Sequence, residues 1–234
     1  MPELEIIAHI HTDFPEKFGI PRQSGLVPEL SGKIVFEKKY RREEAFRGLE
    51  EFSHIWLIWQ FSETVQHGWT PSVRPPKLGG NTRKGVFATR SPFRPNGIGL
   101  SCVRLEAVKL EHGEPVIYVS GVDMMDGTPI YDVKPYLPYV DSHQDATGGF
   151  TDFLEHKLLD VEIPSACLKS FPPEKQEALR HLLAQDPRPA YQKDSNRIYG
   201  ISFAGYEINF TVENSLLRVI SLIPSPDRES EGRI

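Results

Sequence analysis

Cysteine is scarce in this chain of 234 residues: only Cys102 and Cys167 occur, far apart and without a CxxC spacing. That scarcity disfavours both a disulfide framework and a zinc site. Long apolar runs are missing as well, since none approaches the roughly 20 residues of a membrane-spanning helix. The first residues, MPELE, lack the basic and apolar stretches of a secretory signal. We therefore expect a cytoplasmic protein that spans no membrane and holds no metal.

An excess of positive charge is also lacking, because the net charge is −5. This argues against a protein that coats nucleic acid non-specifically, since such binding rests on many contacts between basic side chains and phosphates. A local basic surface is still compatible with this negative net charge. Hydrophobic residues make up 39% and charged residues 25% of the chain, which is ordinary for a globular protein.

The signatures of several common enzyme classes are absent: there is no GxGxxG after a strand pattern, no GxxxxGK[ST], no GxSxG and no HExxH. A Rossmann cofactor domain, a P-loop, a hydrolase elbow and a zinc peptidase site therefore have no sequence support. His9 and His11 would share one face of a strand, but two side chains alone make no metal site, so solvated histidines are the better interpretation. Asp123, Asp126 and Asp132 cluster near a turn and leave a Mg²⁺ site open, although a β-turn at Asp126 explains one of them without metal.

The first part of the chain is a series of strand patterns joined by long loops. Strands are expected at residues 4–11, 32–40, 55–61, 85–89, 98–109, 115–122 and 129–133. The almost continuous apolar run at 55–61 predicts a buried central strand, and the spacing of apolar residues at 42–52 predicts a short helix. Residues 14–30 and 67–84, rich in proline and glycine, are expected to be irregular. A mainly antiparallel or mixed, barrel-like sheet fits this order better than βαβ units.

The second part of the chain has a different rhythm. The polar stretch 141–152 predicts a domain boundary, and we divide the chain into residues 1–145 and 146–234. Beyond it we expect a strand at 155–163, a helix at 173–185 that begins with two prolines, and strands at 197–203, 207–212 and 216–223. The fold class is therefore α+β and mainly β, with a smaller C-terminal α+β domain.

One segment, from Thr64 to Leu105, holds no Asp or Glu although acids outnumber bases in the whole chain. Its bases are Arg74, Lys77, Arg83, Lys84, Arg90, Arg94 and Arg104. Such a group repels itself unless an anion neutralises it, and arginine suits bidentate contact with phosphate or carboxylate. The alternative is a loop whose bases pair with acids elsewhere in the chain.

The most informative part of this segment is residues 89–101, TRSPFRPNGIGLS, which lie between two expected strands. Prolines and glycines restrict the backbone, while Arg90, Ser91, Arg94 and Asn96 supply polar groups. A rigid loop on a β-scaffold is suited to binding a ligand. The alternative is a surface loop in which proline only lowers the entropy of the unfolded chain.

Several stretches resemble the TsaA-like family. They are GIPRQ at 19–23, FSHIW at 52–56, VRPPKLGGN at 73–81, GVFATRSPFRPN at 85–96, DGTP at 126–129 and DVKPYLP at 132–138. DPRPAY at 186–191 further resembles the TrmO-type branch of that family, which comprises tRNA methyltransferases. The likeness runs in order over most of the chain. One departure is Gly97, which stands where the family pattern leads us to expect proline.

The resemblance implies a cofactor domain that is a β-barrel rather than a Rossmann fold, a homodimer, and S-adenosylmethionine as cofactor. It implies methylation of N6 of a threonylcarbamoyl-modified adenosine beside the anticodon of tRNA. The cofactor-binding residues that it implies are Pro21, Arg22, Gln23, Ser62, Glu63, Arg90, Leu100, Asp126, Gly127, Thr128 and Pro129. The residues themselves leave the proton acceptor of that reaction unassigned, with Glu63 and Asp126 as candidates.

For the RNA, basic and aromatic side chains are the candidates for contacts with phosphates and exposed bases. They are Arg74, Lys77, Arg83, Lys84, Arg94, Arg188 and Tyr191. Trp69 is a further candidate for base stacking, and the alternative for it is a role in the core or in a dimer. The alternative for residues 186–191 is a purely structural connection between a helix and a strand. Two other functions stay open: a non-catalytic RNA-binding module, and a methyltransferase of an anionic small molecule.

Overall fold

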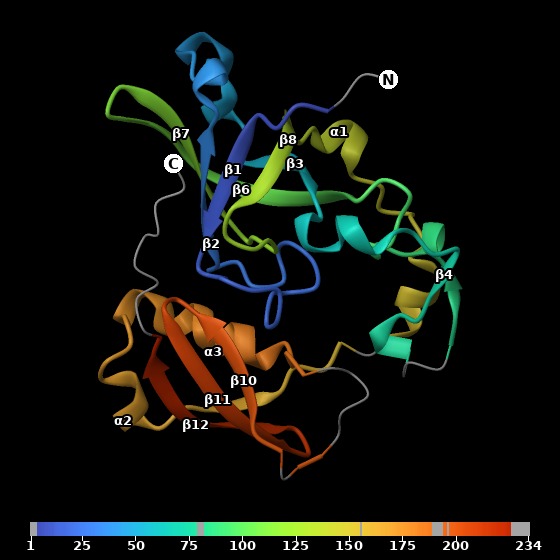
Figure 1. Cartoon of the computed structure of the whole chain (residues 1–234), viewed down its shortest axis with the longest axis vertical. Coiled ribbons are helices and arrows are strands. Elements are labelled where there is room, and N and C mark those ends of the chain that lie inside the picture. The colour runs from blue at the N-terminus through green and yellow to red at the C-terminus, as the bar shows by residue number, and fades with distance from the viewer. Residues whose placement is uncertain (1–3, 79–81, 155, 189–193, 196, 226–234) are drawn as a thin grey trace.

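The N-terminal part of the protein is a closed six-stranded barrel in the order β1-β2-β7-β6-β3-β8 (Figure 1). The computed structural model describes residues 4–78, 82–154, 156–188, 194–195 and 197–225. The barrel strands are β1 (Ala8–Thr12), β2 (Ser31–Phe36), β3 (His54–Gln60), β6 (Ile98–Glu111), β7 (Glu114–Ser120) and β8 (Thr128–Pro135). Each strand is antiparallel to its neighbours, and the pairing of β1 with β8 closes the sheet. The prediction of a mainly β, barrel-like fold is confirmed.

Strand β3 shows how the sequence fills the barrel. It pairs with β6 on one side and β8 on the other, as expected of a central strand. Ile55, Leu57 and Trp59 point inward and are buried, whereas Trp56 and Ile58 face outward and are partly exposed. The expected burial of the whole run was therefore wrong, because one face of a barrel strand faces the interior and the other does not.

Two local predictions were also wrong. Residues 42–52 form two short 3-10 helices, η2 (Glu43–Phe46) and η3 (Leu49–Glu51), because Gly48 between them has a φ of 84° that an α-helix excludes. Of the strand expected at 85–89, only Gly85 lies in a strand, and the chain continues as the 3-10 helix η6 (Val86–Ala88). Here the Thr89 hydroxyl and amide both return to the Val86 carbonyl, which closes a turn.

Between β3 and β6 the chain makes a long excursion, seen on the right of Figure 1. It contains the 3-10 helices η4 (Ser62–His67) and η5 (Pro76–Leu78) and a small ladder of β4 (Ser72–Val73) with β5 (Lys84–Gly85). Apart from these short pieces the described residues of the excursion are irregular, as its prolines and glycines predict.

The C-terminal part is a four-stranded sheet in the order β10-β11-β12-β9, covered by one helix. Its elements are β9 (Asp160–Glu162), α2 (Ser165–Leu168), η8 (Pro173–Lys175), α3 (Gln176–Ala184), β10 (Tyr199–Phe203), β11 (Tyr206–Glu213) and β12 (Leu216–Pro224). Leu179, Leu182 and Leu183 of α3 are buried, on the face that the sequence predicts. Of the expected strand at 155–163, residue 155 lies outside the described residues, and among 156–163 only β9 is a strand, parallel to β12. Helix α1 (Pro138–Asp141) and η7 (Gly149–Phe153) lie in the connection between the two parts.

The two parts are joined through one continuous hydrophobic core. The ring of Phe14, in the loop after β1, lies 5.2 Å from that of Phe203 in β10. At the same place the Asp13 backbone carbonyl accepts a hydrogen bond from the Ala204 amide at 3.0 Å, and the Asp13 carboxylate forms an ion pair with Lys175 at 2.5 Å. Loop 13–30 therefore lies between the barrel and the second domain (Figure 1). Among the described residues no helix has the length and apolar character needed to cross a membrane.

Candidate active site

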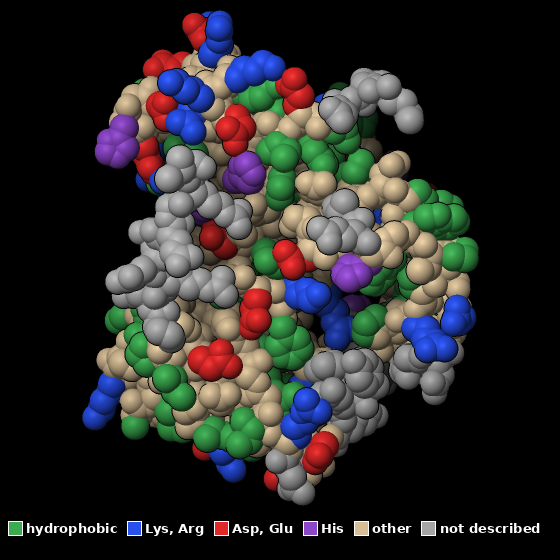
Figure 2. Space-filling view, viewed as in Figure 1, with side chains coloured by type: hydrophobic (Ala, Val, Ile, Leu, Met, Phe, Trp, Pro, Cys, Tyr) green, Lys and Arg blue, Asp and Glu red, His purple; other side chains and the backbone are tan. Residues whose placement is uncertain are grey.

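A cavity of about 960 Å³ opens where the barrel, the excursion and the second domain meet. Four segments line most of it: loop 17–22, residues 59–64 at the end of β3, the excursion with loop 89–93, and the turn before β8. Phe150 and the connection 187–188 complete the wall. In Figure 2 basic side chains lie beside the hollow between the barrel and the second domain. Its size is that of a site for a drug-sized ligand or a nucleoside.

At the end of the barrel a chain of hydrogen bonds leads into this cavity. Trp59 Nε1 donates to Ser101 Oγ at 3.0 Å, and Ser101 Oγ donates to the Asp123 carboxylate at 2.7 Å. The indole of Trp59 lies against Gly99, where any side chain would collide with it. Trp59 and Asp123 both line the cavity. The barrel core thus fixes the position of one carboxylate at the wall.

Asp123 has a strongly perturbed carboxyl group. Burial raises its pKa to about 6, against the lowering effect of hydrogen bonds from Ser101 and from backbone amides. The nearby positive charge of Arg90 lowers the pKa by a smaller amount. A carboxyl group that titrates near neutral pH in a cavity is a frequent mark of a functional site.

Three arginines line the cavity on the surrounding loops: Arg22, Arg90 and Arg188. Arg90 donates through Nη1 to the Gln23 side-chain oxygen, which ties loop 89–93 to the loop after β1. Desolvation by its neighbours lowers the pKa of the Arg22 guanidinium, and the negative charge of Asp186 opposes this effect. Arg188 donates to Asp186 from Nε at 2.7 Å and from Nη2 at 2.9 Å. One acid thus acts on two arginines of the cavity wall.

Asp186 has a φ of 53°, in the left-handed region that few residues other than glycine adopt. It follows the C-terminus of α3, where its amide donates to the Leu183 carbonyl. This backbone turns the chain toward the cavity, and the side chain then holds Arg188 in place. Sequence reasoning treated the DPRPAY stretch as a turn and missed the role of its first acid.

The structure gathers part of the expected cofactor residues. Those that line the cavity are Pro21, Arg22, Ser62, Glu63, Arg90 and Thr128. Gln23 stands behind them as the acceptor for Arg90. Leu100, Asp126, Gly127 and Pro129 are not part of the cavity wall.

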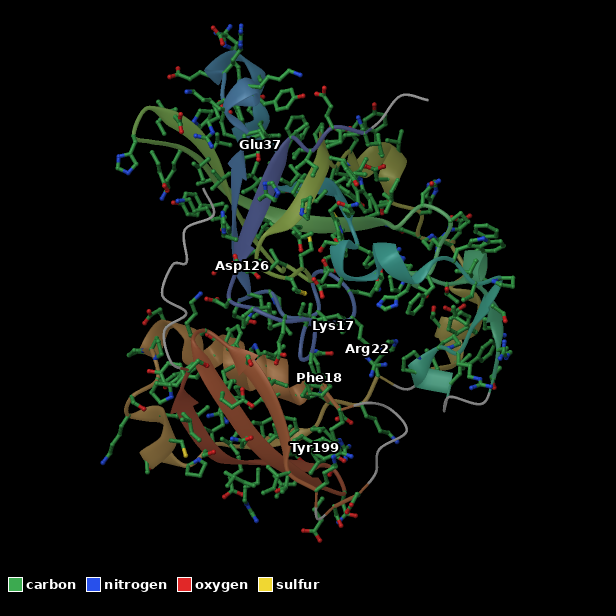
Figure 3. All side chains as sticks on the ribbon, viewed as in Figure 1. Lys17, Phe18, Arg22, Glu37, Asp126 and Tyr199 are labelled. Carbon is green, nitrogen blue, oxygen red and sulfur yellow. The ribbon has the colours of Figure 1, made fainter. Side chains whose placement is uncertain are left out.

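Asp126 follows the cavity-lining Met125 along the chain but is engaged with β1, and Figure 3 labels it apart from Arg22. Its Oδ1 accepts from the Thr12 amide at 3.1 Å and lies 3.1 Å from His11 Nδ1. Leu100 faces outward from β6 and is 52% exposed. These two residues lie at the surface of the single chain, away from the cavity.

The expected RNA-binding residues divide in the same way. Arg74, Arg83 and Arg188 line the cavity. Lys84 lies over the ring of Phe150, with its Nζ 5.5 Å from the centroid. Arg94 donates to the carbonyls of Val86 and Thr89, at 3.3 and 2.6 Å, and so fastens its own loop.

Two further candidates lie outside what the structure describes: Tyr191 entirely, and Lys77 in its side chain. Trp69 is 54% exposed on the excursion. Of the bases in the acid-free segment, Arg104 forms an ion pair within the described residues, with Glu106 at 3.4 Å. The alternative that this segment is neutralised by acids elsewhere therefore gains little support from the described part of the chain.

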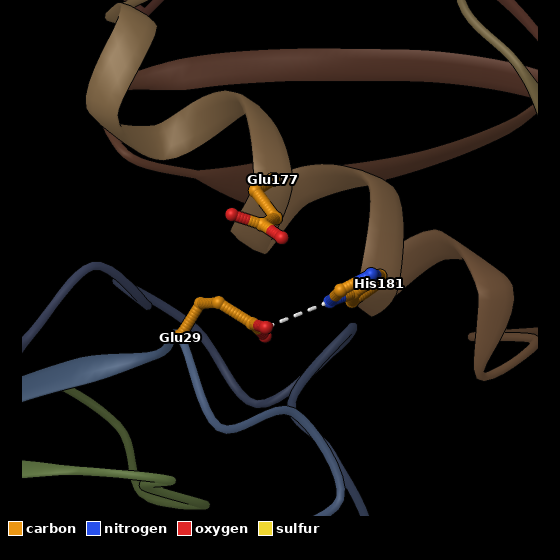
Figure 4. A group of neighbouring side chains, drawn as sticks. All are labelled: Glu29, Glu177 and His181. Carbon is orange, nitrogen blue, oxygen red and sulfur yellow. Dashed lines mark ion pairs between the residues drawn. The ribbon is translucent and has the colours of Figure 1, made fainter.

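One group of side chains at the domain junction has the composition of a metal-ligand set. Glu29, Glu177 and His181 place one ligand atom each within 4.8 Å of the others (Figure 4). His181 Nδ1 lies 2.9 Å from Glu29 Oε1, and the dashed line in Figure 4 marks this pair. None of the three lines the cavity. In the described structure the pair of Glu29 and His181 joins α3 to the loop before β2.

Comparison with known proteins gives matches over both parts of the chain. Residues 9–142 match the family model described as the tRNA-methyltransferase O N-terminal domain, and residues 156–225 match the TrmO C-terminal domain. The tRNA (adenine(37)-N6)-methyltransferase of Escherichia coli K12 is 39% identical over 95% of this chain and 98% of its own. A probable S-adenosyl-L-methionine-binding protein of Pyrococcus abyssi is 36% identical over 65% of this chain and 77% of its own.

Among solved structures, TrmO from Pseudomonas aeruginosa superposes with a TM-score of 0.77 at 33% identity, covering 95% of this chain and 98% of that one. The family-model matches, the identity over nearly the whole length and the shared fold agree with one another. The chain therefore belongs to the TrmO family.

Proposed function

We propose that this protein is an S-adenosylmethionine-dependent methyltransferase that modifies N6 of the adenine beside the anticodon of tRNA, with the threonylcarbamoyl form of that adenosine as its substrate. The observation that carries the proposal is one cavity that combines arginines, aromatic rings and the partly buried carboxylate of Asp123. The Escherichia coli relative is a tRNA (adenine(37)-N6)-methyltransferase, whose name gives the same atom of adenine.

The residues of the cavity fit the proposed cofactor. Arginines such as Arg22 and Arg90 suit a carboxylate group, because their guanidinium groups bind it through paired hydrogen bonds. Carboxylates such as Glu63 suit an ammonium group or ribose hydroxyls, and the rings of Phe18, Phe61 and Phe93 suit an adenine. When bound, the cofactor supplies a methyl group on a positively charged sulfur.

The chain's own task is to align the acceptor with that methyl group, since good alignment can lower a barrier by roughly 7–11 kcal/mol. Arg90 is held for this task by Gln23, and Arg188 by Asp186. Trp59 and Phe61, with ring centroids 4.3 Å apart, exclude water from one wall. We assign cofactor binding mainly to residues 1–145 and tRNA recognition mainly to residues 146–234, with Arg74, Arg83 and Arg188 directed at the RNA.

The test is methyl transfer from labelled S-adenosylmethionine to tRNA that lacks this methyl group, followed by digestion and mass spectrometry of the nucleosides. We expect label on the modified adenosine, and less of it in tRNA that lacks the threonylcarbamoyl group. Absence of cofactor binding in calorimetry would refute the proposal. Salt-sensitive tRNA binding without transfer would favour an RNA-binding module, and label in a small anionic metabolite would favour the third function.

Arg90→Ala provides a matched test of the cavity. We expect weaker cofactor binding, because the variant loses a guanidinium that faces the cavity and anchors Gln23. Arg104→Ala is the control, since Arg104 belongs to the same acid-free segment but pairs with Glu106 away from the cavity. Equal cofactor affinity in the two variants would show that Arg90 has a purely structural role.

We further propose that the protein acts as a homodimer in the cytoplasm, where its tRNA substrate is found. Leu100, an apolar side chain that is 52% exposed on the barrel surface, is the residue that we expect the second copy to cover. Light scattering should give twice the mass of one chain for the native protein and a lower mass for Leu100→Asp. A native monomer would contradict the dimer while leaving the methyltransferase proposal intact.

A further inference from the structure

We propose that Asp123 is the catalytic residue that accepts the N6 proton of the adenine during methyl transfer, an inference that rests on the proposed function. The overall reaction requires such a group. As the S–CH₃ bond breaks with its electron pair going to sulfur, the new N–CH₃ bond forms, and the proton on N6 moves to the Asp123 carboxylate and then to water. The N6 lone pair is delocalised into the adenine ring, so nitrogen becomes a good nucleophile only as this proton departs.

The position of Asp123 fits this task better than the other carboxylates near the site. It lines the cavity beside Met124, Met125 and Trp59, at the end of a rigid hydrogen-bonded chain from the barrel core. Glu63 also lines the cavity, but it is exposed, and among the described residues none donates a hydrogen bond that would fix its carboxylate. Asp126 lies outside the cavity and is engaged by Thr12.

The surroundings of Asp123 adjust its basicity to the task. Burial raises the pKa of the carboxyl group to about 6, so the group is ionised at neutral pH and yet is a stronger base than a solvated carboxylate. The groups that act on it are the Ser101 hydroxyl from β6, the Ser24 amide from the loop after β1, and the Arg90 guanidinium from loop 89–93. A general base works best when its pKa lies near the working pH.

Asp123→Asn tests the inference, because it keeps the shape and loses the proton acceptor. We expect turnover with tRNA to fall by about 100-fold or more, the range for loss of a general base, while calorimetry gives an S-adenosylmethionine affinity within about threefold of the native protein. Asp132→Asn is the control, since Asp132 follows on β8 and pairs with Lys134 at the surface. A fall of cofactor affinity by tenfold, or turnover within threefold of native, would overturn the assignment.

Two further measurements keep the inference testable if Asp123→Asn folds poorly. Carbon-13 NMR of labelled aspartate in the protein without cofactor should show one carboxyl group that titrates near pH 6. This signal should remain in the spectrum of Asp132→Asn. Its loss in that variant would show that the titrating group is not Asp123. Ser101→Ala removes a hydrogen bond that lowers this pKa, so the acid limb of the turnover profile should move to higher pH. An unmoved limb would overturn the inference.

The failure of the inference is distinguishable from failure of the proposed function. If the native protein binds the cofactor and methylates tRNA, and the Asp123→Asn variant is also active, only the role of Asp123 is refuted. If the native protein neither binds the cofactor nor methylates tRNA, the proposed function is refuted, and the inference with it.

Discussion

Gly99 offers the sharpest test of how the barrel supports the cavity. A Cβ atom at this position would lie 2.2, 2.5 and 2.6 Å from Cε2, Cζ2 and Cδ2 of Trp59, whereas ordinary contact begins at 3.4 Å. The indole would have to retreat by about 1.2 Å at its nearest atom. Trp59 is only 8% exposed, and its Nε1 is held by Ser101 at 3.0 Å, so the ring has little room. Overpacking of this kind costs about 1–3 kcal/mol, and a weakened hydrogen bond adds about 1 kcal/mol.

We therefore expect Gly99→Ala to lower the free energy of unfolding by about 2–4 kcal/mol, measured by urea denaturation at equilibrium. Gly85→Ala is the matched control. Gly85 has a φ of −57°, and nothing lies within 4 Å of a Cβ built there, so alanine should be neutral or stabilise by up to about 1 kcal/mol. Equal stability of the two variants would refute the reasoning, because it would mean that Trp59 is free to move.

Three other predictions concern stability and recognition. The raised pKa of Asp123, about 6 against 3.8, means that the folded state holds this proton more tightly than the unfolded state. The stability that this group contributes is present below pH 4 and is lost as the pH rises through 6. The free energy of unfolding of Asp123→Asn should therefore rise relative to that of the native protein by up to about 3 kcal/mol between pH 4 and 8. A difference in denaturation midpoints that stays constant with pH would contradict this. Phe203→Ala, at the domain junction, should cost about 3–5 kcal/mol in the same assay, whereas Phe153→Ala, 88% exposed, should cost almost nothing. Arg188→Ala should raise the KM for tRNA and leave cofactor affinity in calorimetry unchanged; a matching loss of both would contradict that division of roles.

The barrel could be predicted where local pattern and local chemistry agree. The hairpin of β6 and β7 is one case: alternating apolar residues flank His112 and Gly113, which both adopt the positive φ of a tight hairpin turn. The stretches 42–52 and 85–89 failed because their apolar residues fit more than one local structure. In the first, Gly48 broke the helix, and in the second a turn closed on Val86. Such choices depend on contacts that a short window of sequence does not contain.

The site could be predicted in part for a similar reason. The acid-free segment and its rigid loop pointed to Arg90, and the family resemblance pointed to Arg22 and Glu63, all of which line the cavity. Asp123 was noticed only as one of three acids near a turn. Its distinction comes from Ser101, which is 22 residues away in sequence, and from burial by the barrel. Neither property is written in the residues that flank it.

The loop that carries Pro21 and Arg22 has a consequence for how this molecule can be taken apart. Gly19, at a φ of 95°, leaves only 3.0 Å between a Cβ built there and the side chain of Ile201 in the second domain. This loop is thus held in place by β10, a strand that begins at Tyr199, far along the chain. A barrel without the second domain would lose the surface against which the loop with Arg22 packs. Substitutions in β10 should therefore weaken binding of the methyl donor before they affect the barrel strands.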